Sequence, residues 1–149
     1  MAASLGKGAI LVMPAGNDSQ SNGRVPVTSP LSVAQGVISV GAVQQGDNGY
    51  KVAWYSNSLP TACAPGDEIL SAFTGGKLSA LSGTSMSCAH AAGVAALWWE
   101  YLRSRNPGEV TSRMVAAEML KAVRTEGFSS DTQEIERGAG LLQAPPAKI

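Results

Sequence analysis

Residues 81–93 read Leu81-Ser82-Gly83-Thr84-Ser85-Met86-Ser87-Cys88-Ala89-His90-Ala91-Ala92-Gly93 and are the most informative stretch of the chain. Gly83 allows a tight turn from a strand into a helix, because it has no Cβ to obstruct the turn. Ser85 then falls in the first helical turn, where backbone N–H groups lack intrahelical partners and the helix dipole favours negative charge. A hydroxyl that becomes an alkoxide and then supports an oxyanion is stabilised at such a place. The stretch therefore predicts a nucleophilic serine, Ser85, at the start of a helix whose small residues let it pack into a core.

A second informative stretch runs from Ala9 to Asp18, and its short apolar run predicts a buried, parallel strand. The strand ends in Ala15-Gly16-Asn17. The side-chain amide of Asn17 is a neutral donor that can be fixed in advance to stabilise an oxyanion. An asparagine after a strand is also an ordinary turn residue, so this interpretation of Asn17 depends on the serine motif downstream.

Both stretches resemble the subtilisin-like serine proteases. Gly83-Thr84-Ser85-Met86, followed by His90, matches the nucleophile motif of that family, although Ser87-Cys88-Ala89 stands where many members have Ala-Ser-Pro or Ala-Ala-Pro. Ala15-Gly16-Asn17 matches the family tripeptide whose asparagine donates to the oxyanion. Further matches follow in the family's order, so the resemblance covers nearly the whole chain: Gly36–Val43, Tyr55-Ser56-Asn57, Ala62–Gly66, Glu68–Phe73 and Gly138–Leu142.

The resemblance implies an α/β fold of three layers, with a mostly parallel sheet and flanking helices, in which residues 1–149 form part of a single peptidase domain. It implies that Ser85 and Asn17 are catalytic and that the pocket for the residue before the cleaved bond is walled by Pro14, Ala15 and Gly16. Asp18 then favours basic side chains in that pocket. No cofactor is implied, and no metal is expected, because Thr61 stands near the position of a calcium-binding Asp in relatives and is a poor ligand for a hard cation.

The family's catalytic Asp and His segments precede the asparagine strand, and this chain contains neither of them. Its one histidine, His90, lies five residues after Ser85. On one helix this spacing separates the two side chains by about 140° and about 7.5 Å along the axis. A general base needs heavy-atom reach of about 2.6–3.2 Å, so His90 is expected instead to pack on the inner face of the helix.

The chain alone is therefore predicted to be inactive or nearly so, as part of a serine endopeptidase that hydrolyses peptide bonds through an acyl-enzyme. Its expected partners are a polypeptide substrate and a chain or segment that supplies the catalytic Asp and His. The alternative is a non-catalytic module that binds peptides, or that pairs with a partner through the surface left by the absent segments.

Composition excludes several other classes of function. The 149 residues have a formal net charge of 0, with 44% hydrophobic and 15% charged residues, so nothing favours nucleic acid or an anionic membrane as partner. No apolar run approaches the roughly 20 residues of a membrane span, and the compartment stays open. The two cysteines, Cys63 and Cys88, are too few for a disulfide framework. Both are expected to be small buried residues, and a bridge between them stays open.

Hydrophobic spacing and turn residues predict the remaining elements. The expected strands are 9–13, 37–43 and 51–55, with a hairpin of 68–73 and 77–81 around Thr74-Gly75-Gly76. The expected helices are 85–105, 111–124 with Thr111 as N-cap, a short one starting at 141–144, and the end of one at 1–6. The apolar set of the central helix is Ala89, Ala92, Ala96, Trp99 and Leu102.

Overall fold

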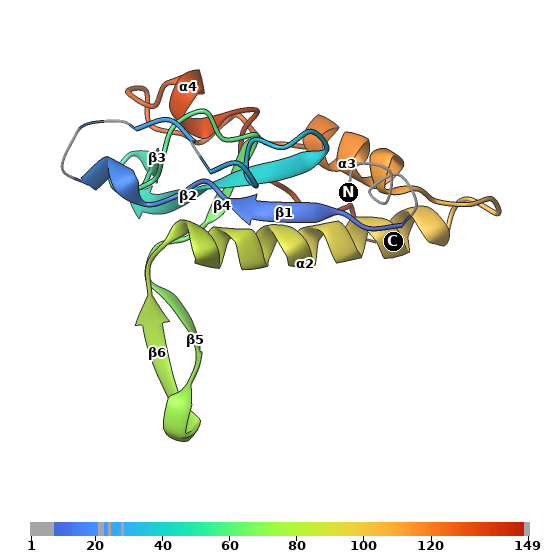
Figure 1. The fold of residues 1–149 in the computed structure, drawn as a ribbon, viewed down its shortest axis with the longest axis horizontal. Helices are drawn as coiled ribbons and strands as arrows, with labels where there is room; N and C mark the ends of the chain where they lie inside the picture. The colour runs from blue at the N-terminus through green and yellow to red at the C-terminus, as the bar shows by residue number, and fades with distance from the viewer. Residues whose placement is uncertain (1–7, 21–22, 24, 28, 148–149) are drawn as a thin grey trace.

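A four-stranded sheet lies at the centre of the structure, a computed structural model that describes residues 8–20, 23, 25–27 and 29–147 (Figure 1). Its middle strand is β2 (Val37–Gly46), with which β1 (Leu11–Pro14) and β4 (Ala62–Pro65) pair in parallel. β3 (Gly49–Val52) folds back antiparallel on the end of β2. The predicted α/β class with a mostly parallel sheet is thus confirmed.

Two helices pack on one face of the sheet, α2 (Thr84–Arg103) and α3 (Ser112–Lys121). A single apolar core joins them to the strands, and its fully or almost fully buried members include Ile38, Val40, Ala62, Ala64, Ala91, Ala95, Trp98, Val115 and Met119. The predicted N-cap of α3 is confirmed, because the Thr111 side chain accepts a hydrogen bond from the backbone N–H of Met114. Among the described residues, no helix is long and apolar enough to cross a bilayer.

The chain between α3 and Leu141 contributes to the opposite face of the sheet, whereas Leu142 returns to the core beside α2. Here Cys63 of β4 packs with Leu141 in a second apolar cluster, against which Phe128 is half-buried. The short helix α4 (Glu134–Arg137) lies on this side, on the other side of the sheet from α2 (Figure 1). The sheet therefore has a covering layer on each face, as the predicted three-layer arrangement requires.

The prediction of a helix starting at Leu141–Ala144 is wrong. Leu141 instead extends the edge of the sheet, because Cys63 donates to Gly140 O at 2.8 Å and accepts from Leu142 N at 2.9 Å. These backbone hydrogen bonds take up the groups that a helix would use internally. The helix end predicted for residues 1–6 lies outside the described residues.

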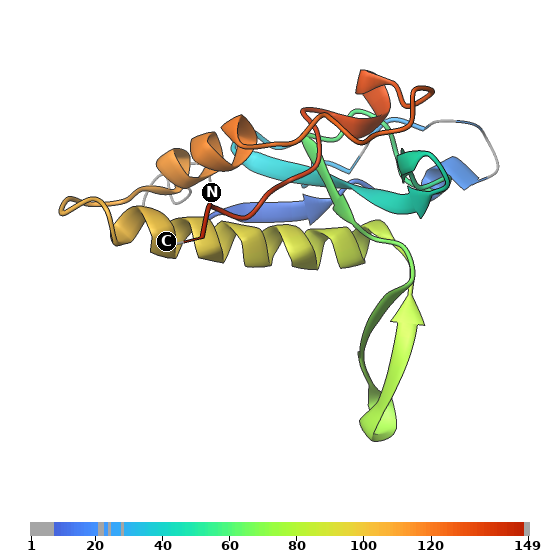
Figure 2. The ribbon, with the colours of Figure 1, turned by 180° about the vertical axis from the view of Figure 1, so that it is seen from behind.

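The hairpin of β5 (Ile69–Phe73) and β6 (Lys77–Leu81) forms as predicted and projects away from the rest of the molecule (Figures 1 and 2). Its register pairs residue 70 with 80 and residue 72 with 78, which puts one wholly apolar and exposed set on one face: Leu70, Ala72, Leu78 and Ala80. An isolated two-stranded hairpin is at best marginally stable in water. The hairpin therefore lacks the packing that ordinarily stabilises such an element.

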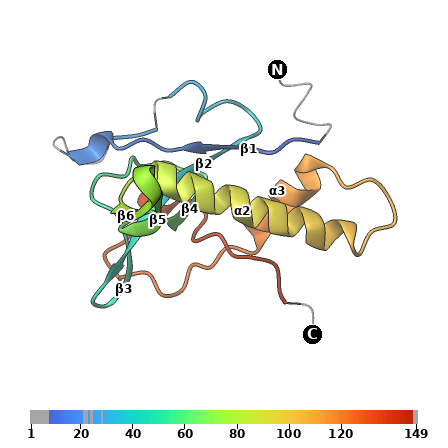
Figure 3. The same ribbon diagram turned by 90° about the horizontal axis from the view of Figure 1, so that it is seen from below.

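Helix α2 buries a different face from the one expected. Ala89, Ala92 and Ala96 are exposed and Trp99 and Leu102 are half-buried, whereas the buried positions are Thr84, Ser87, Ala91, Ala95 and Trp98. Small or apolar residues occur nearly all round this helix, so their spacing does not select one face. Seen from below, α2 lies in front of the described sheet with its outer side uncovered (Figure 3).

Candidate functional site

Ser85 is the second residue of α2 and its side chain is exposed. The turn before it is anchored by Gly83, whose N–H donates to Gly66 O at 2.8 Å. No hydrogen bond joins the Ser85 hydroxyl to another residue that the structure describes. The predicted nucleophile is therefore an accessible hydroxyl at the positive end of a 20-residue helix.

Asn17 lies against the residue that precedes Ser85. The buried Thr84 donates two hydrogen bonds to Asn17 Oδ1, from its backbone N–H and from its hydroxyl, each at 2.9 Å. A backbone N–H only donates, so the carbonyl side of the amide must face Thr84 and Nδ2 must face away. The structure thus brings Asn17 against Thr84, the neighbour of Ser85, 67 positions away in the chain, and among the described residues no hydrogen bond occupies the donor side of its amide.

The three predicted wall residues, Pro14, Ala15 and Gly16, line one hollow of about 320 Å³ next to Asn17. Ala15 N–H donates to Val40 O at 2.9 Å, and Gly16 N–H donates to the Thr84 hydroxyl at 3.2 Å. The wall is therefore fixed both to the sheet and to the start of α2. The remaining lining comes from Met13, Asp18, Ser29, Leu31, Ser32 and Asn57.

Sequence reasoning missed the importance of Asn57, which entered only as the last residue of Tyr55-Ser56-Asn57. This side chain is almost completely buried. It donates to Asp18 Oδ2 at 2.9 Å and accepts from Asp18 N–H at 2.8 Å. No local sequence pattern indicates this pair, because its members lie 39 residues apart.

The turn at Gly66 supports the start of α2 from the other side. Gly66 O accepts from the hydroxyl of the buried Tyr55 at 2.9 Å, as well as from Gly83 N–H. Burial and the neighbouring Asp67 carboxylate raise the pKa of Tyr55 to about 12, so this hydroxyl remains a donor at neutral pH. A Cβ on Gly66 would overlap the buried Ser87 Oγ. The close approach of these two segments therefore requires glycine at position 66.

His90 does not pack on the inner face of α2, and that prediction is wrong. It is exposed, and its Nδ1 lies 3.0 Å from Met86 O. The helix is unbroken from Thr84 to Arg103, so the separation of His90 from Ser85 holds.

Cys63 and Cys88 are not joined by a disulfide bond in the structure. Cys63 is buried, as expected, and Cys88 is half-buried and donates to Val12 O at 3.3 Å. Burial raises the pKa of the Cys88 thiol. Within the described part of the chain, no three His, Cys, Asp or Glu side chains come together in a group that would hold a metal ion.

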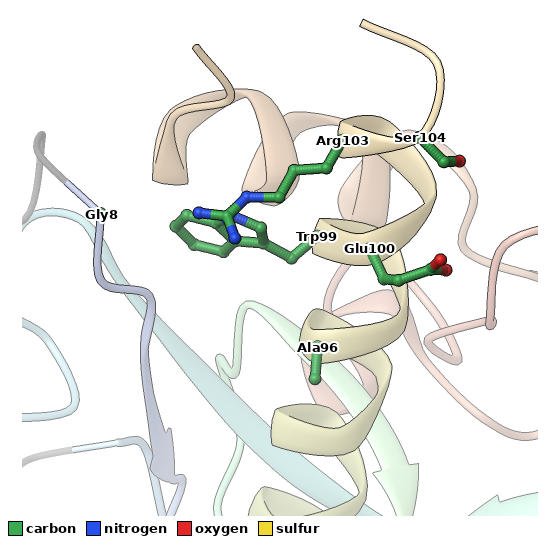
Figure 4. Close-up of a pocket in the computed structure, with 6 residues that line it drawn as sticks. All are labelled: Gly8, Ala96, Trp99, Glu100, Arg103 and Ser104. Atoms are coloured by element: carbon green, nitrogen blue, oxygen red, sulfur yellow. The ribbon is translucent and has the colours of Figure 1, made fainter.

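A larger hollow, of about 700 Å³, lies beside the far end of α2 (Figure 4). Its lining is Gly8, Ala96, Trp99, Glu100, Arg103 and Ser104. The Arg103 guanidinium lies over the Trp99 ring, 5.7 Å from its centre. This hollow lies at the opposite end of α2 from Ser85, and its one hydroxyl, that of Ser104, donates to Tyr101 O at 2.9 Å. It is a continuation of the uncovered side of α2.

Comparison with known proteins gives consistent matches. The model of the subtilase family matches residues 2–140. A thermophilic serine proteinase of Bacillus sp. (strain AK1) is 42% identical over 61% of this chain and 21% of its own length. An intracellular serine protease of Paenibacillus polymyxa is 33% identical over 89% of this chain and 40% of its own length.

Among solved structures, the prenylagaramide maturation protease PagA superposes with a TM-score of 0.72 and 25% identity. The match covers 91% of this chain and 48% of the PagA chain. The chain thus spans less than half the length of these relatives.

Proposed function

Because the chain belongs to the subtilase family, we propose that it carries the nucleophile and oxyanion-donor part of a serine endopeptidase active site, with Ser85 and Asn17 in these roles. The observation that supports this most is the pair of hydrogen bonds from Thr84 to Asn17 Oδ1. They leave Nδ2 as a free, oriented donor beside the turn that holds Ser85. A preformed donor of this kind stabilises a developing oxyanion without reorganisation during the reaction.

In the proposed reaction, Ser85 Oγ bonds to the carbonyl carbon of a peptide and its proton passes to an imidazole. The carbonyl oxygen becomes an oxyanion that accepts from Asn17 Nδ2 and from the backbone N–H of Ser85. The C–N bond then breaks, and the amine leaves with the proton. Water hydrolyses the acyl ester and restores the hydroxyl. Pro14, Ala15 and Gly16 wall the pocket for the residue before the cleaved bond.

The imidazole must come from a different segment or chain. His90 is the one histidine of these 149 residues, and its position on α2 keeps it from Ser85. An unassisted serine hydroxyl is a weak nucleophile. The chain alone is therefore proposed to be inactive or nearly so, and its partner carries a His together with the Asp that orients it.

Two apolar surfaces that no described residue covers lie on the elements before and after Ser85 in the chain, the β5–β6 hairpin and α2, and support such a partner. One is the hairpin face described above, on which Leu70 is 65% and Leu78 69% exposed. The other is the outer face of α2, whose exposed residues run from Ser85 along Ala89, Ala92, Gly93 and Ala96. Small residues on a helix allow close backbone approach. A segment that covers both surfaces would have to cross the start of α2, where Ser85 lies and where a base is needed.

A fluorophosphonate probe tests this proposal, because Ser85 Oγ would displace fluoride from phosphorus and keep the label. The chain is incubated with the probe alone, and again with a separate polypeptide that carries the Asp and His segments of a subtilase. We expect labelling only in the mixture, abolished by Ser85→Ala and retained by the control Ser82→Ala, which changes an exposed serine three residues away. Peptide binding with no labelling in any mixture would refute the endopeptidase proposal and favour the non-catalytic module.

A further inference from the structure

Asn17 is flanked by residues that are both held by one buried residue, Asn57, through its backbone on one side and its side chain on the other. Asn57 is 1% exposed. Its backbone N–H donates to Gly16 O at 3.0 Å, on the amino-terminal side of Asn17. Its side chain accepts from Asp18 N–H at 2.8 Å and from the Ser19 hydroxyl at 3.3 Å, on the carboxyl-terminal side. Asn57 therefore fixes the backbone on both sides of the proposed oxyanion donor.

The orientation of the Asn57 amide is also determined. Asp18 N–H can only donate, so it must face Asn57 Oδ1, and the Asp18 carboxylate can only accept, so it must face Nδ2. The Nδ2 to Asp18 Oδ2 hydrogen bond, at 2.9 Å, is charge-assisted and of the stronger kind. Asp18 thus has a defined partner from a distant segment.

Gly16 makes this arrangement sterically feasible. A Cβ at position 16 would lie 2.5 Å from Asn57 Nδ2 and 3.0 Å from Asp18 Oδ2, and the residue has a φ of +109°. A side chain there would displace the Asn57 amide from its place under the loop. Gly16, Asn57 and Asp18 therefore form one interlocked unit, which we call the loop clamp.

We propose that Asn57 is a positioning residue: with Asp18 it fixes the loop that carries Asn17, while Thr84 fixes the Asn17 side chain. This rests on the proposed function, in which Asn17 donates to the oxyanion. Displacement of a catalytic donor by about 1 Å can lower a rate by about 100-fold, so a clamp on its backbone has a chemical consequence. In this role the Asp18 carboxylate is a structural partner of Asn57, and its effect on basic substrate side chains is secondary.

Nuclear magnetic resonance relaxation of the chain tests the clamp without any need for activity. The readout is the order parameter of the Asn17 backbone N–H, which we expect to be about 0.85 in the unaltered chain, as in rigid backbone. Asn57→Asp places two carboxylates face to face, and we expect the Asn17 value to fall below about 0.6. The double substitution Asn57→Asp with Asp18→Asn reverses the donor and the acceptor of the same hydrogen bond, and we expect it to restore the Asn17 value.

If Asn57 acted only on stability, order at Asn17 and the melting temperature would rise and fall together in these variants. Thermal unfolding of each variant is measured alongside, because the double variant still buries a carboxylate and is expected to remain less stable than the unaltered chain. Restored order at Asn17 together with incomplete recovery of the melting temperature separates positioning from stability. Unchanged order at Asn17 in Asn57→Asp, or no recovery in the double variant, would overturn the proposal.

Two further variants keep the test decisive. If Asn57→Asp does not fold, Asp18→Ala removes the same hydrogen bond from an exposed position, and an unchanged order parameter at Asn17 would equally overturn the proposal. Ser58→Ala is the matched control, because this neighbouring buried hydroxyl donates to Val25 O and not to a clamp residue, so Asn17 should keep its order. Failure of the fluorophosphonate labelling would refute the proposed function and is read independently of these measurements.

Discussion

Removal of the Thr84 hydroxyl is expected to destabilise the chain by about 2–3 kcal/mol. Thr84→Val keeps the shape of the buried side chain but removes the donor to Asn17 Oδ1 at 2.9 Å and the acceptor of Gly16 N–H at 3.2 Å. Each lost hydrogen bond costs about 1 kcal/mol net, and the partly buried Gly16 N–H left unpaired adds to this, near the lower end of the range of about 1–3 kcal/mol for a buried group. The free energy of unfolding from urea titrations, followed by tryptophan fluorescence, measures the loss.

Thr84→Ser is the matched control for this prediction. It keeps both hydrogen bonds and removes one buried methyl group, a change that typically costs about 1 kcal/mol. We therefore expect the valine variant to be less stable than the serine variant, although valine preserves the packing better. A valine variant within about 0.5 kcal/mol of the unaltered chain, or a serine variant that is the less stable of the two, would refute the role given to the hydroxyl.

Three further changes test other parts of the structure. Gly66→Ala should lower the free energy of unfolding, measured in urea, by at least about 2 kcal/mol, because the new Cβ overlaps Ser87 Oγ. The control Gly108→Ala, with open space around position 108, should lower that free energy by less than about 1 kcal/mol. The pKa of Tyr55 is raised from the ordinary value of 10 to about 12 in the folded chain, so the folded state holds this proton more tightly than the unfolded state. The free energy of unfolding should therefore fall, by at most about 3 kcal/mol, as the pH rises from 10 through about 12. A Tyr55→Phe variant that shows the same fall would contradict this. Thr111→Ala should cost about 1 kcal/mol of stability by loss of the N-cap, and Thr111→Ser should retain most of it, as measured by thermal unfolding.

Local chemistry explains why several elements could be predicted from the sequence. The turn of the β5–β6 hairpin contains Gly75 and Gly76, which adopt φ values of +73° and +70° that other residues rarely take. The N-cap at Thr111 depends only on its own hydroxyl and an N–H three residues on. The start of α2 follows from Gly83 and the motif around Ser85. In each case the determining interaction lies within a few residues.

Other features depend on contacts between distant segments and were missed for that reason. Helix α4 is an exception: its capping box of Gln133 and Glu136 is local, but its four residues are too few to produce a periodic pattern. Leu141 joins the sheet because the edge of β4 offers it partners 78 positions away, at Cys63. The residues of α2 are small or apolar on nearly every side, so only the observed packing distinguishes the buried Ala91 from the exposed Ala92.

The candidate site also depends on contacts between distant segments. The motifs identified Ser85 and Asn17, and the structure brings their segments together through Thr84. The orientation of the Asn17 amide could not be read from the sequence, because it is determined by donors 67 residues away. The partnership of Asn57 with Asp18 is hidden in the same way.

The manner in which Thr84 holds Asn17 has a consequence for chemical ageing. Both hydrogen bonds end on Oδ1, and a carboxylate oxygen accepts from an N–H and a hydroxyl at least as well as an amide oxygen does. Deamidation of Asn17 to Asp would therefore leave the loop in place and the fold intact. It would replace the outward-facing donor by a negatively charged oxygen, which under the proposed function would repel the oxyanion. Such damage would then act on the proposed chemistry rather than on the hydrogen bonds that hold the loop.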